Sequence, residues 1–312
     1  MNQQPLDFFR SRKKNTIKVI DNISFDLHHG EILVVAGESG SGKTTLARII
    51  IKALNADSGK IIFDNRDITN LKGKDLFRIR SKMQMIFQDP YSSLDPRMKV
   101  FDIIKEPLQV HNKGLKKNEI KQAIYSALSK VNLEPLDEIS NKYPHMLSGG
   151  QRQRVSFARS LVLKPKLIIA DEPVSMLDVS VRLQILSLMK KLKEIDNISF
   201  LYITHDLSTS RYVGDNIIVL YKGQIIEYGN LQDVITNPLH PYTKALIAAI
   251  PKLRQSEYSK IAVKNEFDQS TTYQGCKFLH KCIYAIDKCE HEAPNLTIDD
   301  KNHKVRCFNY KS

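Results

Sequence analysis

The sequence lacks any apolar run that approaches the length of a membrane span. A helix needs about 20 consecutive, mostly apolar residues to cross a bilayer. The first residues also lack the basic and then apolar pattern of a secretion signal. Internal repeats and low-complexity tracts are missing as well. We therefore expect a globular chain that lies in the cytosol and contacts a membrane only through partner proteins.

Positive charge is not gathered in one part of the sequence, although the formal net charge is +13. Such an excess would suit a nucleic-acid partner. The basic residues are spread along the chain, with local concentrations at 10–14, 72–82 and 113–121. Dispersed charge is more typical of a solvated surface, including one that faces anionic lipid. We therefore expect no nucleic-acid partner. The length of 312 residues suffices for one large α/β core and a small appendage.

A glycine-rich loop joins an apolar run to a helical pattern early in the chain. Residues 32–36 are all apolar, as in a strand buried on both faces, and the pattern GxxxxGKT follows at 37–44. Glycines let successive N–H groups point at phosphate oxygens, and the start of a helix adds its positive end. We expect Lys43 on the β- and γ-phosphates and the Thr44 hydroxyl on Mg²⁺. The predicted nucleotide-binding residues are Gly37, Glu38, Ser39, Gly40, Ser41, Gly42, Lys43, Thr44 and Thr45.

A second apolar run, at 167–170, ends in two acidic residues. Asp171 matches the residue that holds Mg²⁺ in other phosphate-loop ATPases. Glu172 follows at the carboxyl end of the predicted strand, where open α/β sheets place their chemistry. A carboxylate there can polarise the water that attacks the γ-phosphate, an effect worth about 10²–10⁴-fold in rate. We predict that Glu172 is the catalytic base; the alternative is a surface acid pair at a strand end.

The sequence Leu-Ser-Gly-Gly-Gln at 147–151 opens a predicted helix. Ser148 is a strong N-cap residue, and Val155 and Ala158 share one helix face. Gly149 and Gly150 leave the amides at the helix start uncovered, so that an anion can approach them. Taken alone, this pentapeptide fits an ordinary capped helix equally well.

Three further elements complete a family pattern. They are Gln88 in Met-Ile-Phe-Gln-Asp-Pro, Ser-Met-Leu-Asp at 175–178, and His205 after the apolar run at 198–204. With the motifs above, and in this order, the sequence over residues 15–250 resembles the ATP-binding cassette (ABC) family. The resemblance implies an α/β, ABC-type P-loop NTPase fold with a parallel core sheet, an antiparallel β subdomain, a helical insert and a small Cys-rich C-terminal extension.

The resemblance also implies a role for each motif. In the family, the signature residues, here Ser148, Gly149, Gly150 and Gln151, contact the γ-phosphate held by the phosphate loop of a second ATPase. The loop that contains Asp178 crosses to that partner. The glutamine matched by Gln88 touches Mg²⁺ and signals to a membrane subunit, and the histidine matched by His205 contacts the γ-phosphate. Catalysis is thus expected from Glu172, His205 and Gln88, and Mg²⁺ binding from Thr44, Gln88 and Asp171.

The family usually stacks an aromatic ring on adenine, from a position some twenty residues before the phosphate loop. Ile17 and Val19 occupy that region here, while Phe8 and Phe9 lie further upstream. Phe9 is the candidate for this contact. The alternative is that the two phenylalanines only pack against the protein.

The resemblance implies an ABC cassette at 1–250 and an extension with the four cysteines at 251–312. Strands are expected around the phosphate loop at 18–20, 23–27, 32–36 and 60–63, and a hairpin from 216–220 and 224–228. An amphipathic pattern between Ile120 and Val131 marks the helical subdomain, at about 91–160. By resemblance, this subdomain docks on a membrane partner.

All four cysteines, Cys276, Cys282, Cys289 and Cys307, lie in the extension. Four thiols in a cytosolic protein indicate metal rather than disulfides. Their gaps contain no CxxC knuckle, which disfavours a zinc ribbon, whereas four thiolates suit a [4Fe–4S] cluster. Zn²⁺, with help from His280, His291 or His303, and scattered structural cysteines remain the alternatives.

Two segments narrow the resemblance further. His-Pro-Tyr-Thr-Lys-Ala-Leu at 240–246 and Phe-Gln-Asp-Pro-Tyr-Ser-Ser-Leu at 87–94 resemble ATPase subunits of oligopeptide and dipeptide importers, with the latter closer to the second of two such subunits. The resemblance implies that the chain hydrolyses ATP, with Mg²⁺, to power uptake of peptides or of a related solute such as nickel or an oligosaccharide.

The resemblance also implies an assembly at the cytoplasmic face of the membrane. Its members would be a second homologous ATPase subunit, two membrane permease subunits and an extracytoplasmic solute-binding protein. A heterodimer of ATPases is expected, with a homodimer left open. One alternative is a soluble ABC ATPase acting on nucleic acid or ribosomes, which usually has two cassettes or a long coiled coil. Another is a regulatory module that binds ATP without hydrolysing it.

Overall fold

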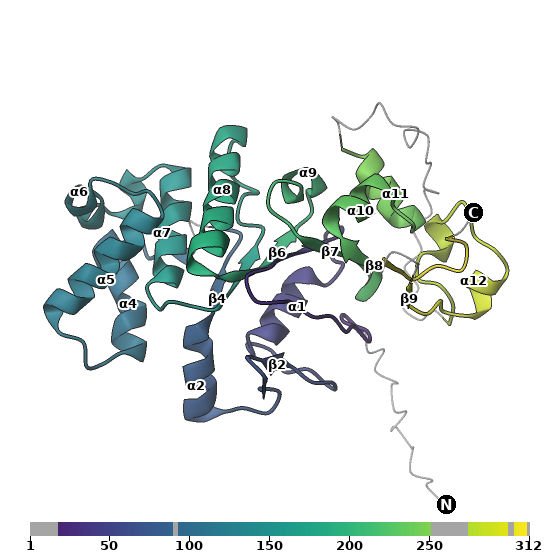
Figure 1. Ribbon diagram of the computed structural model, residues 1–312, viewed down its shortest axis with the longest axis horizontal. Helices are drawn as coiled ribbons and strands as arrows, with labels where there is room; N and C mark the ends of the chain where they lie inside the picture. Colours follow the sequence, from purple (N-terminus) through teal and green to yellow (C-terminus); the bar gives the residue numbers. More distant parts are fainter. Residues whose placement is uncertain (1–17, 90–92, 251–273, 299–302, 311–312) are drawn as a thin grey trace, which may run out of the picture.

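The structure is a computed structural model that describes residues 18–89, 93–250, 274–298 and 303–310 (Figure 1). An eight-stranded mixed sheet runs through the middle of the molecule. Its strand order is β4-β5-β6-β1-β7-β8-β10-β9, in which β4 to β7 are parallel and the last three strands are antiparallel to their neighbours. The strands are β4 (Met83–Ile86), β5 (Leu167–Asp171), β6 (Ser199–Thr204), β1 (Ile32–Ala36), β7 (Asn216–Tyr221), β8 (Gln224–Asn230), β10 (Lys304–Val305) and β9 (Thr297–Ile298).

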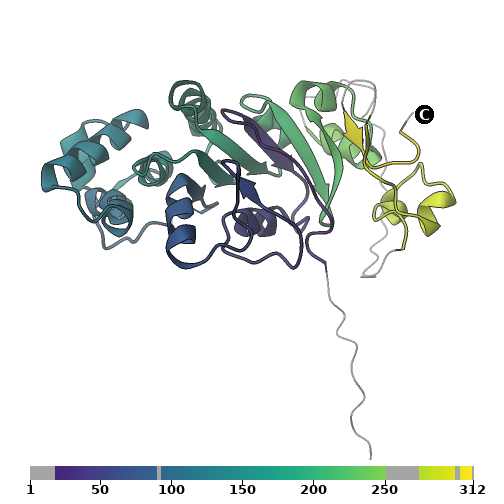
Figure 2. The same ribbon diagram turned by 60° about the horizontal axis from the view of Figure 1, so that its bottom comes forward.

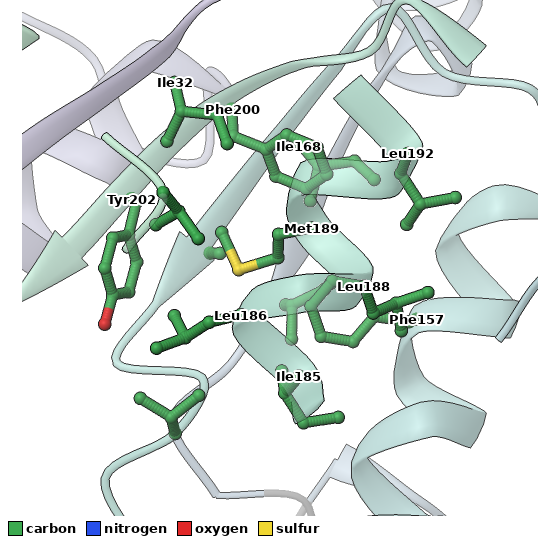
Figure 3. Packing of buried hydrophobic residues seen from close by; sticks show 14 of the residues in the cluster. Ile32, Phe157, Ile168, Ile185, Leu186, Leu188, Met189, Leu192, Phe200 and Tyr202 are labelled. Atoms are coloured by element: carbon green, nitrogen blue, oxygen red, sulfur yellow. The ribbon is translucent and has the colours of Figure 1, made fainter. Parts of the chain in front are cut away.

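The central strands are buried on both faces, because helices cover the sheet from two sides. In β1, Ile32 and Val34 belong to one hydrophobic cluster, while Leu33 and Val35 belong to another. The alternation follows from the two-residue period of a strand. The first cluster includes α8 (Val179–Asp196), whose Met189 packs among strand residues in Figure 3. The second includes α1 (Lys43–Ile50) and α2 (Gly73–Lys82) on the opposite face.

A group of helices lies at one end of the molecule, on the left in Figure 1. It contains α4 (Val100–His111), α5 (Lys117–Lys130), α6 (Leu136–Asn141), the short 3₁₀ helix Pro144–Met146 and α7 (Gly149–Leu161). The apolar face predicted for α7 is buried, with Val155 and Ala158 fully inaccessible. Because α7 contacts α4 and α5 on one side and β4 and α8 on the other, it joins this group to the sheet.

The antiparallel part before the helices is smaller than the sequence predicts. It consists of β2 (Ile62–Phe63) paired with β3 (Arg66–Asp67). The strands expected at 18–20 and 23–27 were wrong, because these residues form no strand. Their apolar side chains, including Ile23 and Phe25, still pack against the second cluster. Among the described residues, these side chains are thus partly buried although their backbone is not paired as a strand.

The described part of the extension is attached to the main sheet rather than separate from it. The strand β10 pairs with β8 and places Val305 opposite Glu227. The helices α9 (Leu207–Ser210), α10 (Leu231–Thr236) and α11 (Pro241–Ala248) lie in the last part of the cassette, and α12 (Lys288–His291) lies in the extension (Figures 1 and 2). Within the described ranges, none of the helices has the length and hydrophobicity needed to span a membrane.

Candidate nucleotide site

The glycine-rich loop lies between β1 and α1, as the sequence predicts. Gly37 needs to be glycine, because an added Cβ would lie 2.3 Å from the carbonyl oxygen of Leu220. Gly42 is the N-cap of α1 with a φ of 104°, in the region that glycine occupies at no steric cost. The loop is therefore held in a fold that exposes its backbone amides at the start of a helix.

Lys43 is folded across this loop. Its Nζ donates to the carbonyl oxygens of Gly37 (2.8 Å) and Glu38 (2.9 Å), and the residue is only 5% exposed. Burial lowers the pKa of Lys43, while the nearby Glu172 and Asp171 carboxylates oppose that effect. An ammonium group has three N–H donors, so that one remains for a further acceptor such as a phosphate oxygen.

Asp171 lies at the end of β5, close to the start of α1. Burial raises the pKa of Asp171, and a hydrogen bond with the Thr44 side chain acts in the opposite direction. The two side chains predicted to hold Mg²⁺ are thus adjacent, although they come from positions 127 residues apart in the numbering. Oxygen ligands of this kind, one carboxylate and one hydroxyl, fit a magnesium ion that keeps several waters and a phosphate oxygen.

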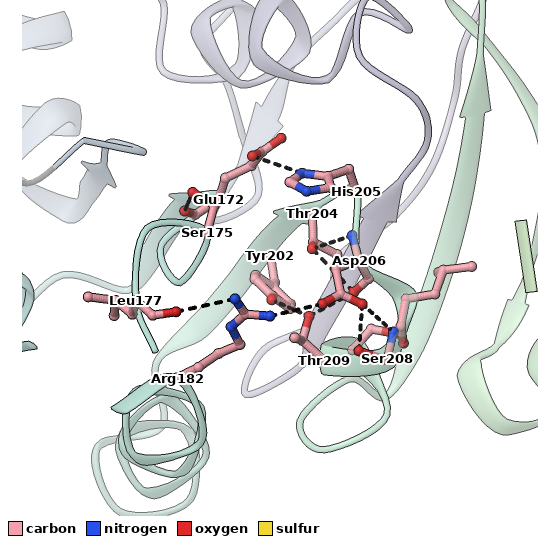
Figure 4. A network of polar contacts seen from close by, with 12 residues as sticks. Glu172, Ser175, Leu177, Arg182, Tyr202, Thr204, His205, Asp206, Ser208 and Thr209 are labelled. Carbon is pink, nitrogen blue, oxygen red and sulfur yellow. Dashed lines mark hydrogen bonds and ion pairs between the residues drawn. The ribbon is translucent and has the colours of Figure 1, made fainter. Parts of the chain in front are cut away.

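The Glu172 carboxylate contacts the other two predicted catalytic side chains, Gln88 and His205. Its Oε2 lies 3.0 Å from Nε2 of Gln88 and 2.9 Å from Nδ1 of His205. Figure 4 shows the contact with His205 at the ends of β5 and β6. Glu172 itself has a φ of 47°, in the left-handed region that few residues with a side chain adopt. The three residues therefore meet at one carboxylate beside the phosphate loop.

The loops that follow Glu172 and His205 are joined by Arg182, which the sequence did not single out. Arg182 Nη1 lies 3.2 Å from Oδ2 of Asp206, and Nη2 donates to the carbonyl oxygen of Leu177 (3.2 Å) (Figure 4). Its Nε is buried without a hydrogen-bond partner in the described part of the chain. The arginine links the segment just before Asp178 to the residue after His205.

The signature residues form a capped helix start, as expected. The Ser148 hydroxyl accepts from the N–H of Gln151 (3.2 Å), and the Gln151 side chain accepts from the N–H of Ser148 (3.0 Å). Gly150 packs so closely on α8 that an added Cβ would lie 2.5 Å from Val181. Asp178 caps α8 by accepting a hydrogen bond from the N–H of Val181. This bond lowers the pKa of the Asp178 carboxyl.

The signature residues open α7, which packs on the face of the sheet opposite to α1, the helix that follows the phosphate loop. The helix α7 belongs to the first hydrophobic cluster and α1 to the second. Figures 1 and 2 both place α7 with the helical group, away from α1. One chain therefore does not bring Ser148, Gly149, Gly150 and Gln151 onto its own phosphate loop.

The four cysteines form no disulfide, and they lie near one another. Burial raises the pKa of Cys276 to about 11, and Cys289, Cys282 and Cys307 act in the same direction. In the described ranges, however, no three His, Cys, Asp or Glu side chains are arranged to hold a single metal ion. His303 contacts the Glu227 carboxylate instead, at 2.7 Å. The described residues thus bring the predicted thiols near one another but form no metal site, which supports neither the expected [4Fe–4S] cluster nor the zinc alternative.

Two further features bear on the site. Tyr242, from the segment that resembled peptide importers, lies beside the phosphate loop and accepts a hydrogen bond from the N–H of Glu38 (2.9 Å). A groove of about 340 Å³ opens between β4, α4 and α7, lined by residues that include Phe87, Glu106, Val110, His111 and Arg159. Phe9, the candidate for adenine stacking, lies outside the described residues.

Comparison with known proteins identifies the family. The sequence profile described as ABC transporter matches residues 20–175. The chain belongs to the ABC transporter family. A second profile, described as the C-terminal region of oligopeptide/dipeptide transporters, matches residues 226–289 of this ABC protein. The family predicted from the motifs is confirmed, and with it the assignment as an ATPase of the ABC type.

Relatives of this ABC protein match most of its length. The oligopeptide transport ATP-binding protein OppF of Streptococcus mutans is 48% identical over 244 residues, which is 78% of this chain and 79% of that protein. The oligopeptide transport ATP-binding protein AppF of Bacillus subtilis is 40% identical over 304 residues, 96% of this chain and 92% of its own length.

Solved structures confirm the predicted fold class. The ATP-binding cassette MJ0796, in a dimeric post-hydrolysis state bound to ADP and Pi, is 32% identical and superposes with a TM-score of 0.62, covering 69% of this chain and 91% of that one. The cbiO1 protein of Clostridium perfringens, part of the ABC transporter complex cbiONQ, is 28% identical with a TM-score of 0.65 and covers 76% and 91%.

Proposed function

We propose that this ABC ATPase powers the import of oligopeptides or dipeptides. Relatives named for oligopeptide transport match it over most of their length, and residues 226–289 match the profile of the C-terminal region of oligopeptide/dipeptide transporters. The observation that carries the catalytic part is the contact of both Gln88 and His205 with the Glu172 carboxylate. Glu172 would orient and deprotonate the attacking water, and His205 would contact the γ-phosphate.

The nucleotide would be bound between two ATPases. The separation of the signature loop from the phosphate loop within one chain supports this arrangement, as does the dimeric state of the similar cassette MJ0796. Residues 37–45 of one subunit would hold the phosphates, and Ser148, Gly149, Gly150 and Gln151 of the other would close over them. Ser148 caps the helix, and Gly149 and Gly150 add no side chain of their own at its start. We propose a related chain as the partner, because the segment at 87–94 resembles the second of two such ATPase subunits.

Magnesium would be held by Thr44, Gln88 and Asp171, and it would neutralise charge on the β- and γ-phosphates. Thr44 and Asp171 are already adjacent, and Gln88 reaches the same region through Glu172. Asp178 would approach the partner from the start of α8. Phe9 stays a candidate for the adenine contact on its sequence position alone.

The groove between β4, α4 and α7 would receive a segment of a membrane permease subunit. It lies next to Gln88, so that an occupant could sense the nucleotide through this residue. Its rim combines exposed Phe87 and Val110 with the charged Glu106 and Arg159, which suits an amphipathic partner segment. The complex would hold two permease subunits and a solute-binding protein, with this chain at the cytoplasmic face. The cassette would comprise residues 1–250, with its helical subdomain at 91–160, and the extension 251–312.

We propose that Cys276, Cys282, Cys289 and Cys307 hold a [4Fe–4S] cluster. In such a cluster each thiolate binds a different iron, so the sulfurs surround a cube instead of meeting at one atom. Four neighbouring thiols in a segment without CxxC spacing support this proposal. The cluster would stabilise the extension, since ATP hydrolysis transfers no electrons.

The proposed metal is tested by anaerobic purification and elemental analysis. Iron and acid-labile sulfide should both be present, and both should be lost in Cys276→Ser. The variant Gln274→Ala, which shortens an exposed side chain two residues before Cys276 but removes no thiol, should keep them. A protein that contains zinc alone would rule the cluster out.

The transported solute is tested in the organism that carries the gene. Deleting the gene should abolish uptake of a radiolabelled tri- or pentapeptide, and wild type should restore it whereas Glu172→Gln should not. Nickel and oligosaccharide uptake are measured in the same strains. Normal peptide uptake together with a loss of nickel or oligosaccharide uptake would replace peptide as the solute. A salt-sensitive complex with nucleic acid would instead favour the soluble ABC ATPase.

A further inference from the structure

One peptide group of the phosphate loop is held at both of its ends. The carbonyl oxygen of Gly37 accepts from Lys43 Nζ at 2.8 Å, while the N–H of Glu38, on the same peptide plane, donates to the Tyr242 hydroxyl at 2.9 Å. A trans peptide is rigid and points these two groups in opposite directions. The tyrosine therefore fixes the carbonyl that positions the lysine amine. Gly37 has no side chain that could hold this peptide, and an added one would collide with the backbone at Leu220.

The extension packs directly on this tyrosine. Phe278 is 3% exposed, and its ring centroid lies 5.6 Å from that of Tyr242 and 5.3 Å from that of Tyr221, both in tilted or edge-on arrangements. Such pairs are worth about 0.5–1.5 kcal/mol beyond the area that they bury. Tyr242 is 2% exposed. The side chains packed around its ring, Phe278 among them, therefore hold its hydroxyl toward the phosphate loop. Phe278 falls between Cys276 and Cys282 in the sequence.

A second connection runs through the turn between β7 and β8. Lys277 Nζ donates to the carbonyl oxygen of Lys222 (2.9 Å) and pairs with Asp21 (2.9 Å). The N–H of the next residue, Gly223, donates to the carbonyl oxygen of Ser41 in the phosphate loop (2.9 Å). A third contact, Lys281 to Glu38 at 3.8 Å, joins half-exposed side chains and contributes little.

We propose that residues 276–282 of the extension are a positioning element for the phosphate loop, with Tyr242 as the positioning residue through which they act. The inference rests on the proposed nucleotide site and adds a dependence of nucleotide affinity on the extension. Tyr242 touches no phosphate; it holds the Gly37–Glu38 peptide so that the Lys43 amine stays in place before nucleotide arrives. The extension keeps the Tyr242 ring fixed by covering it with Phe278.

The test compares MgADP binding in Tyr242→Phe and Tyr125→Phe by isothermal titration calorimetry. MgADP is chosen because it occupies the phosphate loop without requiring closure of two ATPases. Loss of the Tyr242 hydroxyl should weaken binding about three- to tenfold, the net worth of one hydrogen bond. Tyr125→Phe removes a hydroxyl that donates to Asp137 in the helical group, far from the loop, and should leave the affinity unchanged.

A purely structural role is separated by unfolding each variant with and without MgADP. If Tyr242 only supported the fold, its variant would unfold at a lower temperature in both conditions, with the same increment from nucleotide. Positioning predicts a smaller increment in Tyr242→Phe than in wild type. Equal affinities and equal increments would overturn the inference.

The role of the extension is tested with Phe278→Leu and its combination with Tyr242→Phe. Both changes act through the same peptide. The fold-loss of MgADP affinity in the double variant should therefore be smaller than the product of the fold-losses in the two single variants. Lys277→Gln serves as a second variant if Phe278→Leu does not fold, and it should also weaken binding. The control is Lys288→Gln, in which a lysine that pairs with Glu292 within the extension is removed.

Failure of this inference and failure of the proposed function give different results. Wild-type protein that binds no MgADP would refute the nucleotide site itself. Wild-type binding that is shared by all of the variants, including Phe278→Leu and Lys277→Gln, would leave the nucleotide site in place and overturn the role of residues 276–282.

Discussion

His205 and Glu172 are brought together by the parallel pairing of two neighbouring strands, with Nδ1 of the histidine 2.9 Å from Oε2 of the glutamate. The register places Ile203 opposite Asp171, so the residues that follow each strand end lie side by side. The Glu172 side chain is 16% exposed and His205 is 55% exposed. The carboxylate is thus largely shielded, while the imidazole is open to solvent on its other side.

The first prediction concerns Glu172→Gln. The amide keeps the size of the side chain but cannot accept a proton, so hydrolysis should fall by about 10²-fold or more. ATP binding should persist, because Lys43 and the loop amides are unchanged. Release of inorganic phosphate measures the first effect. Light scattering with MgATP should show dimers that persist longer than those of the wild type.

The matched control for this experiment is Glu194→Gln, which changes an exposed acid on α8. It should hydrolyse ATP at the wild-type rate. If Glu172→Gln also kept the wild-type rate, Glu172 would not be the catalytic base.

The second prediction concerns Lys43→Ala. The lysine is a buried cation close to Asp171 and Glu172, and without it these two acids would repel the phosphates. Loss of a charged hydrogen bond costs about 1.5–3 kcal/mol, so nucleotide affinity should fall by about 10- to 150-fold or more. Calorimetry with MgADP measures it, and the exposed Lys191→Ala on α8 is the control. Retained affinity would refute the assigned phosphate loop.

The central sheet and the candidate site could be predicted because local sequence specifies them. Uniformly apolar runs such as 32–36 and 167–170 become strands buried on both faces. A glycine pattern with a lysine fixes the loop between strand and helix. The carboxyl ends of parallel strands then bring Glu172 and His205 to one edge, which is a consequence of topology and needs no further information.

Long-range contacts could not be predicted in the same way. The apolar alternation at 23–27 indicates burial, but whether the backbone pairs with another strand depends on a distant partner. In the sequence, Arg182 is one more charged residue on a predicted helix. Its contacts with Leu177 and Asp206 depend on two loops that only the folded chain brings together. Tyr242 lies in a segment that the sequence did single out, yet its contact with Glu38 spans 204 residues.

The third prediction concerns Arg182→Met. The change leaves the Asp206 carboxylate and the Leu177 carbonyl without this donor, so the free energy of unfolding should fall by about 1–3 kcal/mol. Hydrolysis should fall as well, since the arginine joins the segment before Asp178 to the residue after His205. MgADP affinity should be unchanged, because the phosphate loop is not touched.

Arg182→Lys provides the comparison for that prediction. It restores a positive charge but lacks the planar fork that reaches two acceptors, so it should recover only part of the lost activity. Denaturant unfolding and phosphate release separate the two effects. Full wild-type hydrolysis in Arg182→Met would show that the two loops are held independently of this side chain.

The fourth prediction is a pH dependence of stability that depends on His240. This residue is buried, and burial lowers its pKa from 6.5 to about 3. Between these values the unfolded chain takes up a proton that the folded chain excludes, so the free energy of unfolding falls as the pH decreases below 6.5. The loss is about 1.4 kcal/mol per pH unit, or about 2 kcal/mol by pH 5.

His240→Asn should remove this contribution while keeping an acceptor for the N–H of Tyr242, which His240 Nδ1 accepts at 3.0 Å. Urea unfolding at pH 7 and pH 5 should therefore show a smaller loss for His240→Asn than for wild type, by about 2 kcal/mol. His145→Asn, at an exposed position, is the control and should follow the wild type. If the wild type and His240→Asn lost the same stability over this range, His240 would titrate alike in the folded and unfolded chains, and burial would not be what keeps it neutral.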